Sequence, residues 1–354
     1  MSNKLQLLLV FGAMSSEYSV SCVSAASVLE NLNKEKYDVK VLGITQEGNW
    51  FLTDATPEQI RDGSWEKLNN TRAILSPSRD ASGLVVLKDF EIFFVKIDVI
   101  FPVMHGAFGE DGKIQGLFEL SGIPYVGCGV SASAVCMDKA ITKTVMNEAD
   151  IKQARYITFF EKDFNENKES LLQRFENELK YPYFIKPANT GSSIGISKVN
   201  NINEAINAIE LALNYDYKII AEENIIGSEI EVAVLGNSNP IASICGEIAP
   251  ERDFYDFEAK YNDVNSKLYI PARLDEQTSQ KVRDTAIKCY TAAGCTGLSR
   301  VDFFVNKDSG DIIFNEINSL PGFTSISMYP KLFEASGIPY SKLLDAIIDL
   351  ALEQ

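Results

Sequence analysis

The stretch NEINSLPGF (residues 315–323) places an acid and an amide two positions apart, Glu316 and Asn318. The segment SRVDFFV repeats this spacing with Arg300 and Asp302, and the polar NKDSG between the two apolar runs predicts a hairpin. Side chains two apart share a face of a strand, and antiparallel pairing would place Asp302 opposite the residue before Glu316. If the faces coincide, three oxygen ligands and a guanidinium converge, which suits Mg²⁺ bound with a nucleotide. An exposed polar strand edge is the alternative.

A second segment, FIKPANTGSSIGISK (184–198), is suited to phosphate binding. Lys186 ends an apolar strand and leads into a turn of small residues, which are Gly191, Ser192, Ser193 and Gly195. Glycines let backbone N–H groups approach phosphate oxygens, and serines add donors. No GK[ST] follows, so this is not a Walker A loop, and a plain glycine-rich hairpin turn remains the alternative.

Two further candidates lie in the first third of the chain. His105, in HGAFGEDGKIQG, follows a predicted strand end, where α/β sheets place ligand-binding groups. Glu17 stands at the predicted N-terminus of a helix, where a carboxylate in a cleft could hold an ammonium group. A satisfied structural histidine and a helix-dipole acid are the respective alternatives.

Composition narrows the classes of function. The 354 residues carry a net charge of −16, which disfavours general nucleic-acid binding. Six cysteines without a CxxC pair indicate reduced thiols in a cytosolic protein, and a single histidine excludes multi-histidine zinc sites. The apolar run near residue 8 is too short to span a bilayer, so it predicts a buried strand and no membrane insertion.

The elements that must position these residues alternate at first between strand and helix. Strands are expected at 5–11, at YDVKVLGIT and at IDVIFPVMH, and helices within SEYSVSCVSAASVLENL and DGKIQGLFELSG. This order predicts an α/β domain with a parallel sheet over residues 1–127.

A second unit, 128–220, starts with the expected helix SASAVCMDKAITKTVMNEA and continues through the strands ARYITF, YPYFIKP and YKIIAEE. The third, 221–354, combines an antiparallel pair (EIEVAVLG, NPIASICGEI), a helix, the hairpin and a terminal amphipathic helix, so its class is α+β. Residues 251–268 lack periodicity, and such long loops are often functional.

Taken in order, these segments resemble the D-alanine–D-alanine ligases of the ATP-grasp superfamily, which include the related D-alanine–D-serine ligases of vancomycin resistance. The resemblance spans about residues 5–350. It is carried by Glu17 in SSEYSVS, MHGAFGEDGKIQG, MDK, FIKPANTGSSIG, FYDFEAKY, SRVDFF and NEINSLPGFTSISMYP. It implies an ATP-grasp fold of three domains with a Rossmann-like N-terminal domain.

The resemblance also implies a role for individual residues. Nucleotide binding falls to Lys139, Lys186, Ser192, Ser193, Glu222, Glu223, Ile225, Glu229 and Lys260. Two Mg²⁺ ions, with Mn²⁺ as an alternative, are held by Asp302, Glu316 and Asn318. Substrate contacts and catalysis fall to Glu17, His105, Ser192, Tyr261, Arg300, Gly322, Ser327 and Met328. Ser192 and Tyr261 would link to Glu17 and close residues 251–268 as a lid.

The implied reaction joins two D-alanine molecules in the cytoplasm through an acyl phosphate made from ATP, for peptidoglycan synthesis, in a homodimer. Met328 and Tyr261 favour D-alanine as the second substrate, and D-serine is the alternative. The chain departs from the family where Ala13 replaces a glycine and Glu223 a frequent lysine. Another ATP-grasp ligase or a silent nucleotide-binding regulator would lack the HGxxGEDG motif or the metal ligands.

Overall fold

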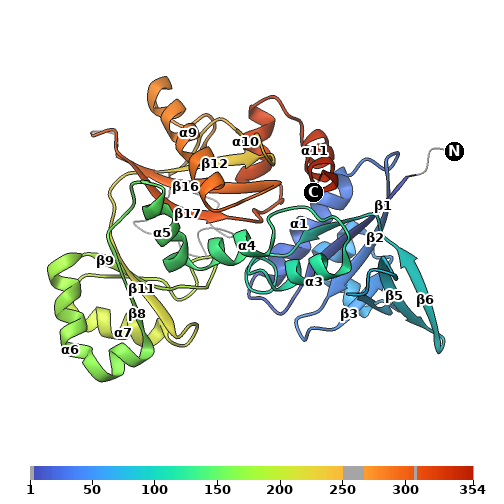
Figure 1. Ribbon diagram of the computed structural model, residues 1–354, viewed down its shortest axis with the longest axis horizontal. Helices are drawn as coiled ribbons and strands as arrows, with labels where there is room; N and C mark the ends of the chain where they lie inside the picture. Colours follow the sequence, from blue (N-terminus) through green and yellow to red (C-terminus); the bar gives the residue numbers. More distant parts are fainter. Residues whose placement is uncertain (1–3, 250–266, 307–308, 354) are drawn as a thin grey trace.

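The computed structural model describes residues 4–249, 267–306 and 309–353, and their elements form three sheets with helices packed on them (Figure 1). The first sheet has seven strands in the order β6-β5-β4-β3-β2-β1-β7. In chain order they are β1 (Leu5–Gly12), β2 (Tyr37–Ile44), β3 (Trp50–Thr53), β4 (Thr71–Leu75), β5 (Gly83–Lys88), β6 (Glu91–Lys96) and β7 (Val99–Val103). Its helices are α1 (Tyr18–Asn31), α2 (Pro57–Arg61), the 3₁₀ helix η1 (Ser64–Lys67) and α3 (Lys113–Ser121).

The predicted parallel sheet is present only in part. β1 pairs in parallel with β2 and β7, as the βα alternation predicts. β3 to β6 extend this unit by antiparallel pairing, so the sheet is mixed. The parallel expectation was wrong for these four strands, because short turns and not helices connect most of them, and only antiparallel neighbours can be joined that way.

Strand β1 is the centre of the N-terminal core. Leu7 and Leu9 pack with α1 and with the last helix α11 (Tyr340–Leu352), whereas Leu8 and Val10 pack with α3 on the other face. A strand covered on both faces is a continuous apolar run, which explains the sequence LQLLLVF. The C-terminal helix therefore completes the core of the N-terminal sheet.

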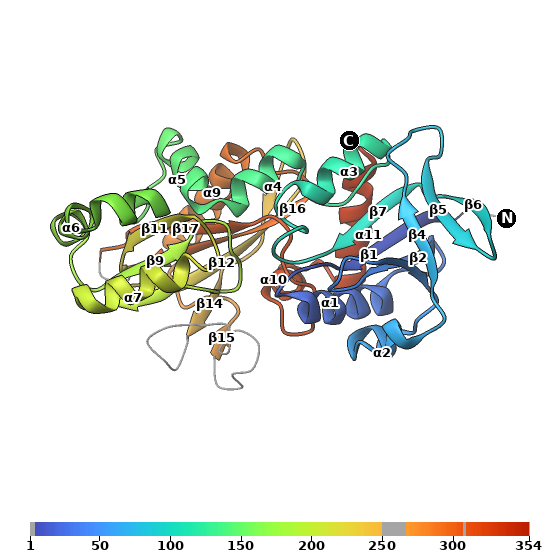
Figure 2. The ribbon, with the colours of Figure 1, turned by 90° about the horizontal axis from the view of Figure 1, so that it is seen from below.

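The second sheet has four antiparallel strands in the order β10-β9-β11-β8 and occupies the opposite end of the molecule (Figure 2). The strands are β8 (Tyr156–Phe160), β9 (Tyr183–Pro187), β10 (Ser197–Val199) and β11 (Lys218–Glu223). Helices α6 (Glu161–Glu178) and α7 (Ile202–Ala212) share one core with Tyr183 and Ile185 of β9. Because side chains alternate, Phe184 and Lys186 of the same strand point to the opposite face.

Two helices, α4 (Val130–Met137) and α5 (Lys139–Glu148), stand where one was predicted. Asp138 separates them: its backbone is extended, and its carboxylate accepts hydrogen bonds from the N–H groups of Ala140 and Ile141, both at 3.1 Å. The prediction of one continuous helix was therefore wrong, since Asp138 is the N-cap of α5.

The third sheet lies between the other two and carries the predicted hairpin (Figures 1 and 2). Its strand order is β15-β14-β12-β16-β17, with β13 paired to β12. The bounds are β12 (Ser228–Leu235), β13 (Ile241–Ala242), β14 (Gly246–Ala249), β15 (Lys267–Tyr269), β16 (Leu298–Val305) and β17 (Ile312–Asn318). Helix α9 (Glu276–Ala292) shares a core with Ile230 and Val232 of β12, and α10 (Met328–Ala335) with Ala233 and Leu235.

All six cysteines are buried free thiols, as their scattered spacing predicts. Within the part of the chain that the structure describes, no helix combines the length and apolarity needed to cross a membrane.

Candidate active site

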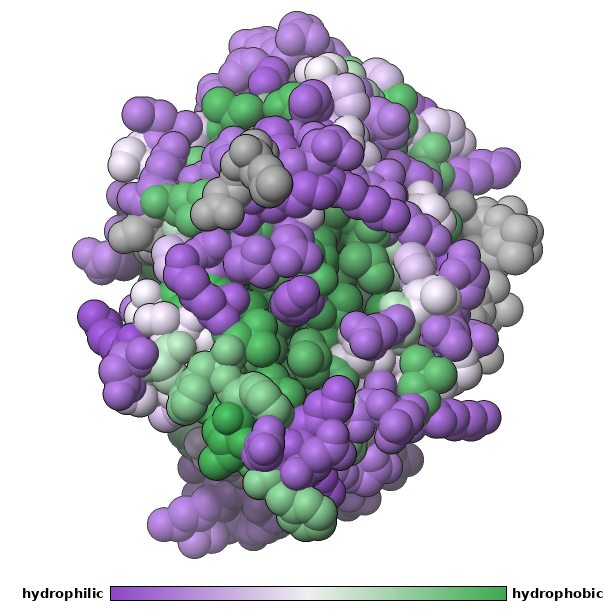
Figure 3. Space-filling model, turned by 90° about the vertical axis from the view of Figure 1, so that its right-hand side faces the viewer, coloured by the Kyte–Doolittle hydropathy of each residue, from purple (hydrophilic) through white to green (hydrophobic). Residues whose placement is uncertain are grey.

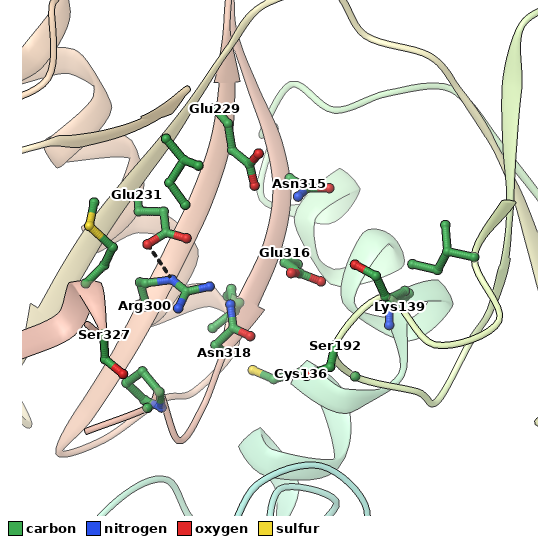
Figure 4. A pocket seen from close by; sticks show the side chains of 18 of the residues that line it. Cys136, Lys139, Ser192, Glu229, Glu231, Arg300, Asn315, Glu316, Asn318 and Ser327 are labelled. Atoms are coloured by element: carbon green, nitrogen blue, oxygen red, sulfur yellow. Dashed lines mark ion pairs between the residues drawn. The ribbon is translucent and has the colours of Figure 1, made fainter. Parts of the chain in front are cut away.

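A cavity of about 920 Å³ is lined by strand residues of the second and third sheets and by residues of α1 and of the loops beside the first sheet. Figure 4 shows side chains from β12, β16 and β17 on one side of it and from α4, α5 and the 191–195 turn on the other. Sixteen of the residues expected at a site line it, namely Glu17, His105, Lys139, Lys186, Ser192, Ser193, Glu222, Glu223, Ile225, Glu229, Arg300, Glu316, Asn318, Gly322, Ser327 and Met328. Asp302 lies beneath its surface, 2% exposed, and Lys260 and Tyr261 lie outside the described residues.

The predicted hairpin brings its polar residues onto one face. Asp302 pairs directly with Glu316, and Arg300 with Asn318, so the register is one residue from the expected one. A bulge follows Asp302, which accounts for the shift. On the other side of β16, Glu231 of β12 pairs with Asp302, so three acids form a row across three strands.

Arg300 and Asp302 form a two-point ion pair in this row. Nε and Nη2 of Arg300 donate to Oδ1 and Oδ2 of Asp302 at 2.8 and 2.7 Å, and Nδ2 of Asn318 donates to Oδ2 at 2.9 Å. Burial opposes the charge of the guanidinium, but the carboxylates of Asp302 and Glu231 hold the pKa of Arg300 well above its usual value. Arg300 is therefore cationic, and it is fixed by its acidic neighbours.

The donor set of this face fits a divalent cation that is bound with phosphate. Asp302, Glu316 and Asn318 offer two carboxylates and one amide, all hard oxygen donors. Across the described residues, no group of three or more His, Cys, Asp and Glu side chains is arranged to hold a metal. Phosphate oxygens would therefore complete the coordination, as is usual for Mg²⁺–nucleotide sites.

Opposite this face, a buried carboxylate lies between two ammonium groups. Oε2 of Glu222 is 2.5 Å from Nζ of Lys186, and Oε1 is 2.7 Å from Nζ of Lys143. Burial would raise the pKa of Glu222, but the two lysines outweigh it and lower that pKa to about 2. Burial also lowers the pKa of Lys143, which is 2% exposed.

Lys143 was missed by sequence reasoning. It lies one helical turn beyond Lys139 on α5, so an i, i+4 lysine pair on a helix that borders the cavity was the available indication. Nζ of Lys139 donates to the carbonyl of Thr190 at 2.5 Å, so the first lysine contacts the glycine-containing turn and the second contacts Glu222.

The turn itself has the backbone that phosphate-binding loops use. Ser192 and Ser193 have φ of 49° and 59°, and Gly195 has φ of 72°, so successive residues adopt left-handed conformations. Ser192 Oγ donates to the carboxylate of Glu17, which joins this turn to the N-terminal domain. A Cβ at Gly191 would lie 2.7 Å from Glu17 Oε2, so a larger residue there would displace the Glu17 carboxylate from its present position.

His105 is buried and engaged on both ring nitrogens. Nε2 lies 3.1 Å from Ser24 Oγ, and Nδ1 lies 3.2 Å from the carbonyl of Leu320. Burial lowers its pKa to about 4, against the smaller effect of the Leu320 carbonyl, so the ring is neutral at pH 7. These contacts position the loop before Gly322.

Glu110 belongs to the motif HGAFGEDGKIQG that begins with His105. It was not selected from the sequence, although it lines the cavity. Its carboxylate accepts a hydrogen bond from Gly106 N at 2.8 Å. Burial, followed by the neighbouring charge of Glu17, raises its pKa to about 8. Its place in the GEDG run of that motif was the available indication that Glu110 belongs to the site.

At the far rim, the unusual Glu223 is paired. Its carboxylate accepts bonds from Nε and Nη2 of Arg155 at 2.9 and 2.8 Å.

At the other end of the cavity, Ser327 Oγ accepts a hydrogen bond from Thr324 N at 3.0 Å, and a Cβ on Gly322 would lie 2.7 Å from this Oγ. The serine hydroxyl thus lies close to the backbone of Gly322, and a side chain at position 322 would move it.

The comparisons with known proteins agree with this arrangement. The family model for the N-terminus of D-ala D-ala ligase matches residues 6–128, and the model for its C-terminus matches residues 145–349. The chain belongs to the D-alanine–D-alanine ligase family.

Relatives in this family are similar along nearly the whole chain. The D-alanine–D-alanine ligase of Caldicellulosiruptor bescii is 48% identical over 99% of this chain and 96% of its own. Among solved structures, the VanG D-Ala:D-Ser ligase of Enterococcus faecalis has a TM-score of 0.90 at 39% identity, covering 99% and 100% of the two chains. The D-alanine–D-alanine ligase of Coxiella burnetii has a TM-score of 0.85 at 35% identity, covering 99% and 95%. Proteins of this family have the ATP-grasp fold, which the resemblance predicted.

Proposed function

We propose that the protein joins two D-alanine molecules to D-alanyl-D-alanine, with ATP converted to ADP and phosphate, for peptidoglycan precursor synthesis. The observation that carries the proposal is the convergence, in one cavity, of a phosphate-type turn, the Asp302–Glu316 row and Glu17. A volume of about 920 Å³ is large enough for a nucleotide and two small amino acids.

The nucleotide would lie between the second and third sheets. Lys139 and Lys186, with the N–H groups of the 191–195 turn, would neutralise its phosphates, while Glu222, Glu223, Ile225 and Glu229 would contact adenine and ribose. Lys260 is assigned to the γ-phosphate by the resemblance alone. These roles fit an acidic chain, because the lysines concentrate positive charge at the phosphates.

Asp302, Glu316 and Asn318 would hold Mg²⁺, two ions by the resemblance, with Mn²⁺ as the alternative. When bound, the ions supply charge neutralisation and orientation of the transferred phosphoryl group. The donor atoms of the face support this assignment.

The chemistry would proceed in two steps. A D-alanine carboxylate, oriented through its ammonium by Glu17, attacks the γ-phosphorus, the bond to the β–γ bridging oxygen breaks, and ADP leaves behind an acyl phosphate. The amine of the second D-alanine then attacks that carbonyl, and phosphate leaves from the tetrahedral centre. Arg300 and the N–H of Gly322 would stabilise the oxyanion, where one such donor is typically worth about 3 kcal/mol.

The second amino acid would bind with its carboxylate at Ser327 and its side chain at Met328, which is buried and lines the cavity. An apolar thioether suits a methyl group. D-serine is the second candidate, because the structural likeness includes a D-Ala:D-Ser ligase. Tyr261, with Ser192 and Glu17, would close the lid over the acyl phosphate and exclude water.

The protein would act as a homodimer in the cytoplasm, where ATP and reduced thiols coexist. Figure 3 shows an apolar area on the end of the molecule that carries β6. By register, Ile74, Leu87, Ile92 and Phe94 share one sheet face, and Ile92 and Phe94 are 60% and 65% exposed. β6 is an edge strand, and antiparallel pairing with a second copy would set Glu91 opposite Lys96.

Three measurements test the proposal. ATP, Mg²⁺ and D-alanine should yield equal amounts of phosphate and dipeptide; turnover only when D-serine is added would select the alternative. Asn318→Ala should lower the apparent Mg²⁺ affinity, measured from the dependence of turnover on Mg²⁺ concentration, by about 10- to 100-fold. Unchanged turnover at every Mg²⁺ concentration would show that Asn318 is not a metal ligand. Ile92→Lys with Phe94→Lys should give a monomer by sedimentation, whereas the exposed control Leu120→Lys should remain dimeric.

A further inference from the structure

Glu231 is a buried acid beside the proposed oxyanion and metal groups, and none of the roles above uses it. It is 3% exposed, on β12, and pairs in register with Asp302 on β16 and with Gly246 on β14. Its side chain shares the face of Glu229, two residues earlier, and Figure 4 shows it directed toward Arg300. A carboxylate at this depth must be strongly compensated to be retained.

The compensation includes the guanidinium of Arg300. Glu231 Oε2 lies 3.2 Å from Arg300 Nε, the same nitrogen that donates to Asp302 Oδ1 at 2.8 Å. Two carboxylates on adjacent strands therefore lie beside one nitrogen, which donates its hydrogen bond to Asp302 and forms an ion pair with Glu231. The shorter contact goes to Asp302, and the longer one to Glu231.

Asp302 accepts three hydrogen bonds in this arrangement. Its Oδ2 accepts from Arg300 Nη2 and Asn318 Nδ2, and its Oδ1 accepts from Arg300 Nε. A carboxylate has roughly four lone-pair sites, so one remains on Oδ1 for a divalent ion. An ion bound there would draw charge from the carboxylate and weaken its bonds to the guanidinium, and Glu231 Oε2 lies 3.2 Å from the same Nε.

We propose that Glu231 is a positioning residue that holds Arg300 when Asp302 coordinates the divalent ion. This proposal rests on the proposed function, since it concerns the same metal ligands and the same oxyanion-binding arginine. The guanidinium moves its charge-assisted bond from one carboxylate to the other, which lies on the adjacent strand, so its direction changes little. Metal binding and the orientation of Arg300 are thereby coupled through the guanidinium that both carboxylates contact.

The coupling predicts what removal of the charge does. In Glu231→Gln, Asp302 is the carboxylate that still forms a two-point ion pair with Arg300, so this ion pair competes harder with the divalent cation. We expect about tenfold weaker Mn²⁺ binding, measured by electron paramagnetic resonance with a non-hydrolysable ATP analogue. kcat should fall while KM for ATP changes less, and Glu231→Asp should restore part of both.

A double-mutant cycle separates this role from the plain electrostatic field of a nearby acid. If Glu231 acts through Arg300, Glu231→Gln has no effect on Mn²⁺ affinity in an Arg300→Met background. A loss of similar size in that background would overturn the inference. Unchanged Mn²⁺ affinity in Glu231→Gln alone would also overturn it, and Glu231→Met, which also removes the charge, provides the same comparison if the glutamine variant does not fold.

A matched control is available on the C-terminal helix α11, where it packs on the N-terminal domain. Asp345 is a buried carboxylate that accepts bonds from Lys36 and Tyr37, both at 2.9 Å. Asp345→Asn should lower stability without changing Mn²⁺ affinity, and a parallel change in the control would overturn the specific role of Glu231. Failure of the wild type to bind Mn²⁺ with the analogue would instead refute the proposed metal site.

Discussion

Replacing Lys143 by methionine removes one of the two ammonium groups that hold Glu222 as a buried anion. Methionine keeps the length of the side chain, so the change is mainly the loss of the 2.7 Å ion pair. Lys186 remains 2.5 Å from the other carboxylate oxygen. The perturbation is therefore the loss of one partner from a buried three-charge group.

The expected size follows from the pKa of Glu222, which falls from 4.5 to about 2. A depression of that size corresponds to roughly 3 kcal/mol of stability at neutral pH. Because Lys186 stays and because burial of the Lys143 ammonium is itself unfavourable, we expect a loss of about 2 kcal/mol, below the range for an isolated buried pair. Urea unfolding at pH 7 measures it.

The sign of the pH dependence of stability provides a second test of the Lys143–Glu222 ion pair. Between pH 4.5 and about 2 the unfolded carboxyl binds a proton that the folded one does not, so the stabilisation is lost as the pH falls through that window. Lys143→Met should make this acid limb shallower. The double variant Lys143→Met with Glu222→Gln should recover part of the loss, because no unpaired charge remains. An unchanged unfolding free energy in the single variant would refute the reasoning.

Three further changes test other parts of the structure. His105→Asn should flatten the fall in stability between pH 6.5 and about 4, worth roughly 3 kcal/mol, and an unaltered slope in urea titrations would show that His105 is not the group responsible. Gly246→Ala places a Cβ 2.3 Å from the Met328 methyl and 2.8 Å from Leu332 Cδ2, so it should raise KM for the acceptor amino acid but not for the donor. Met328→Ala in the double variant should restore part of this KM, because the Leu332 contact remains, and no restoration would contradict the Met328 contact. Ala13→Gly should raise the unfolding free energy by about 1 kcal/mol, because Ala13 has φ of 119°; a lower value would refute this.

Much of the fold was predictable because its strands and helices have simple periodicity. The two-faced burial of β1 appears as an apolar run, and the hairpin β16–β17 as two such runs around a polar turn. The antiparallel extension β3–β6 was not, because Ile92 and Phe94 are apolar yet exposed, so alternation does not distinguish the core face there. Asp138 was read as interior to a helix, since capping depends on backbone geometry that composition does not reveal.

The strand-borne part of the site was predictable for a physical reason. Alternation places residues two apart on one face, which yields Glu316 with Asn318 and Arg300 with Asp302 without any tertiary information. Lys143 and Glu231 were missed because their importance comes from partners on other elements, Glu222 and Arg300. A lysine or glutamate in a helix or strand is usually a solvated residue, so burial had to be seen in three dimensions.

The two charged groups of the cavity explain how an acidic chain can bind a polyanion. Glu222 neutralises part of the charge of Lys143 and Lys186, and Asp302 and Glu231 do the same for Arg300, so each cation is fixed in place before a substrate arrives. A lysine or arginine that a carboxylate already holds loses less conformational freedom when it binds phosphate. The carboxylate must then share this cation with the phosphate. Where one cation has two carboxylates, as Arg300 does, one could bind a metal ion while the other kept the guanidinium in place. Under the proposed function, the row of acids across β12, β16 and β17 would therefore let metal binding and oxyanion stabilisation occupy adjacent atoms.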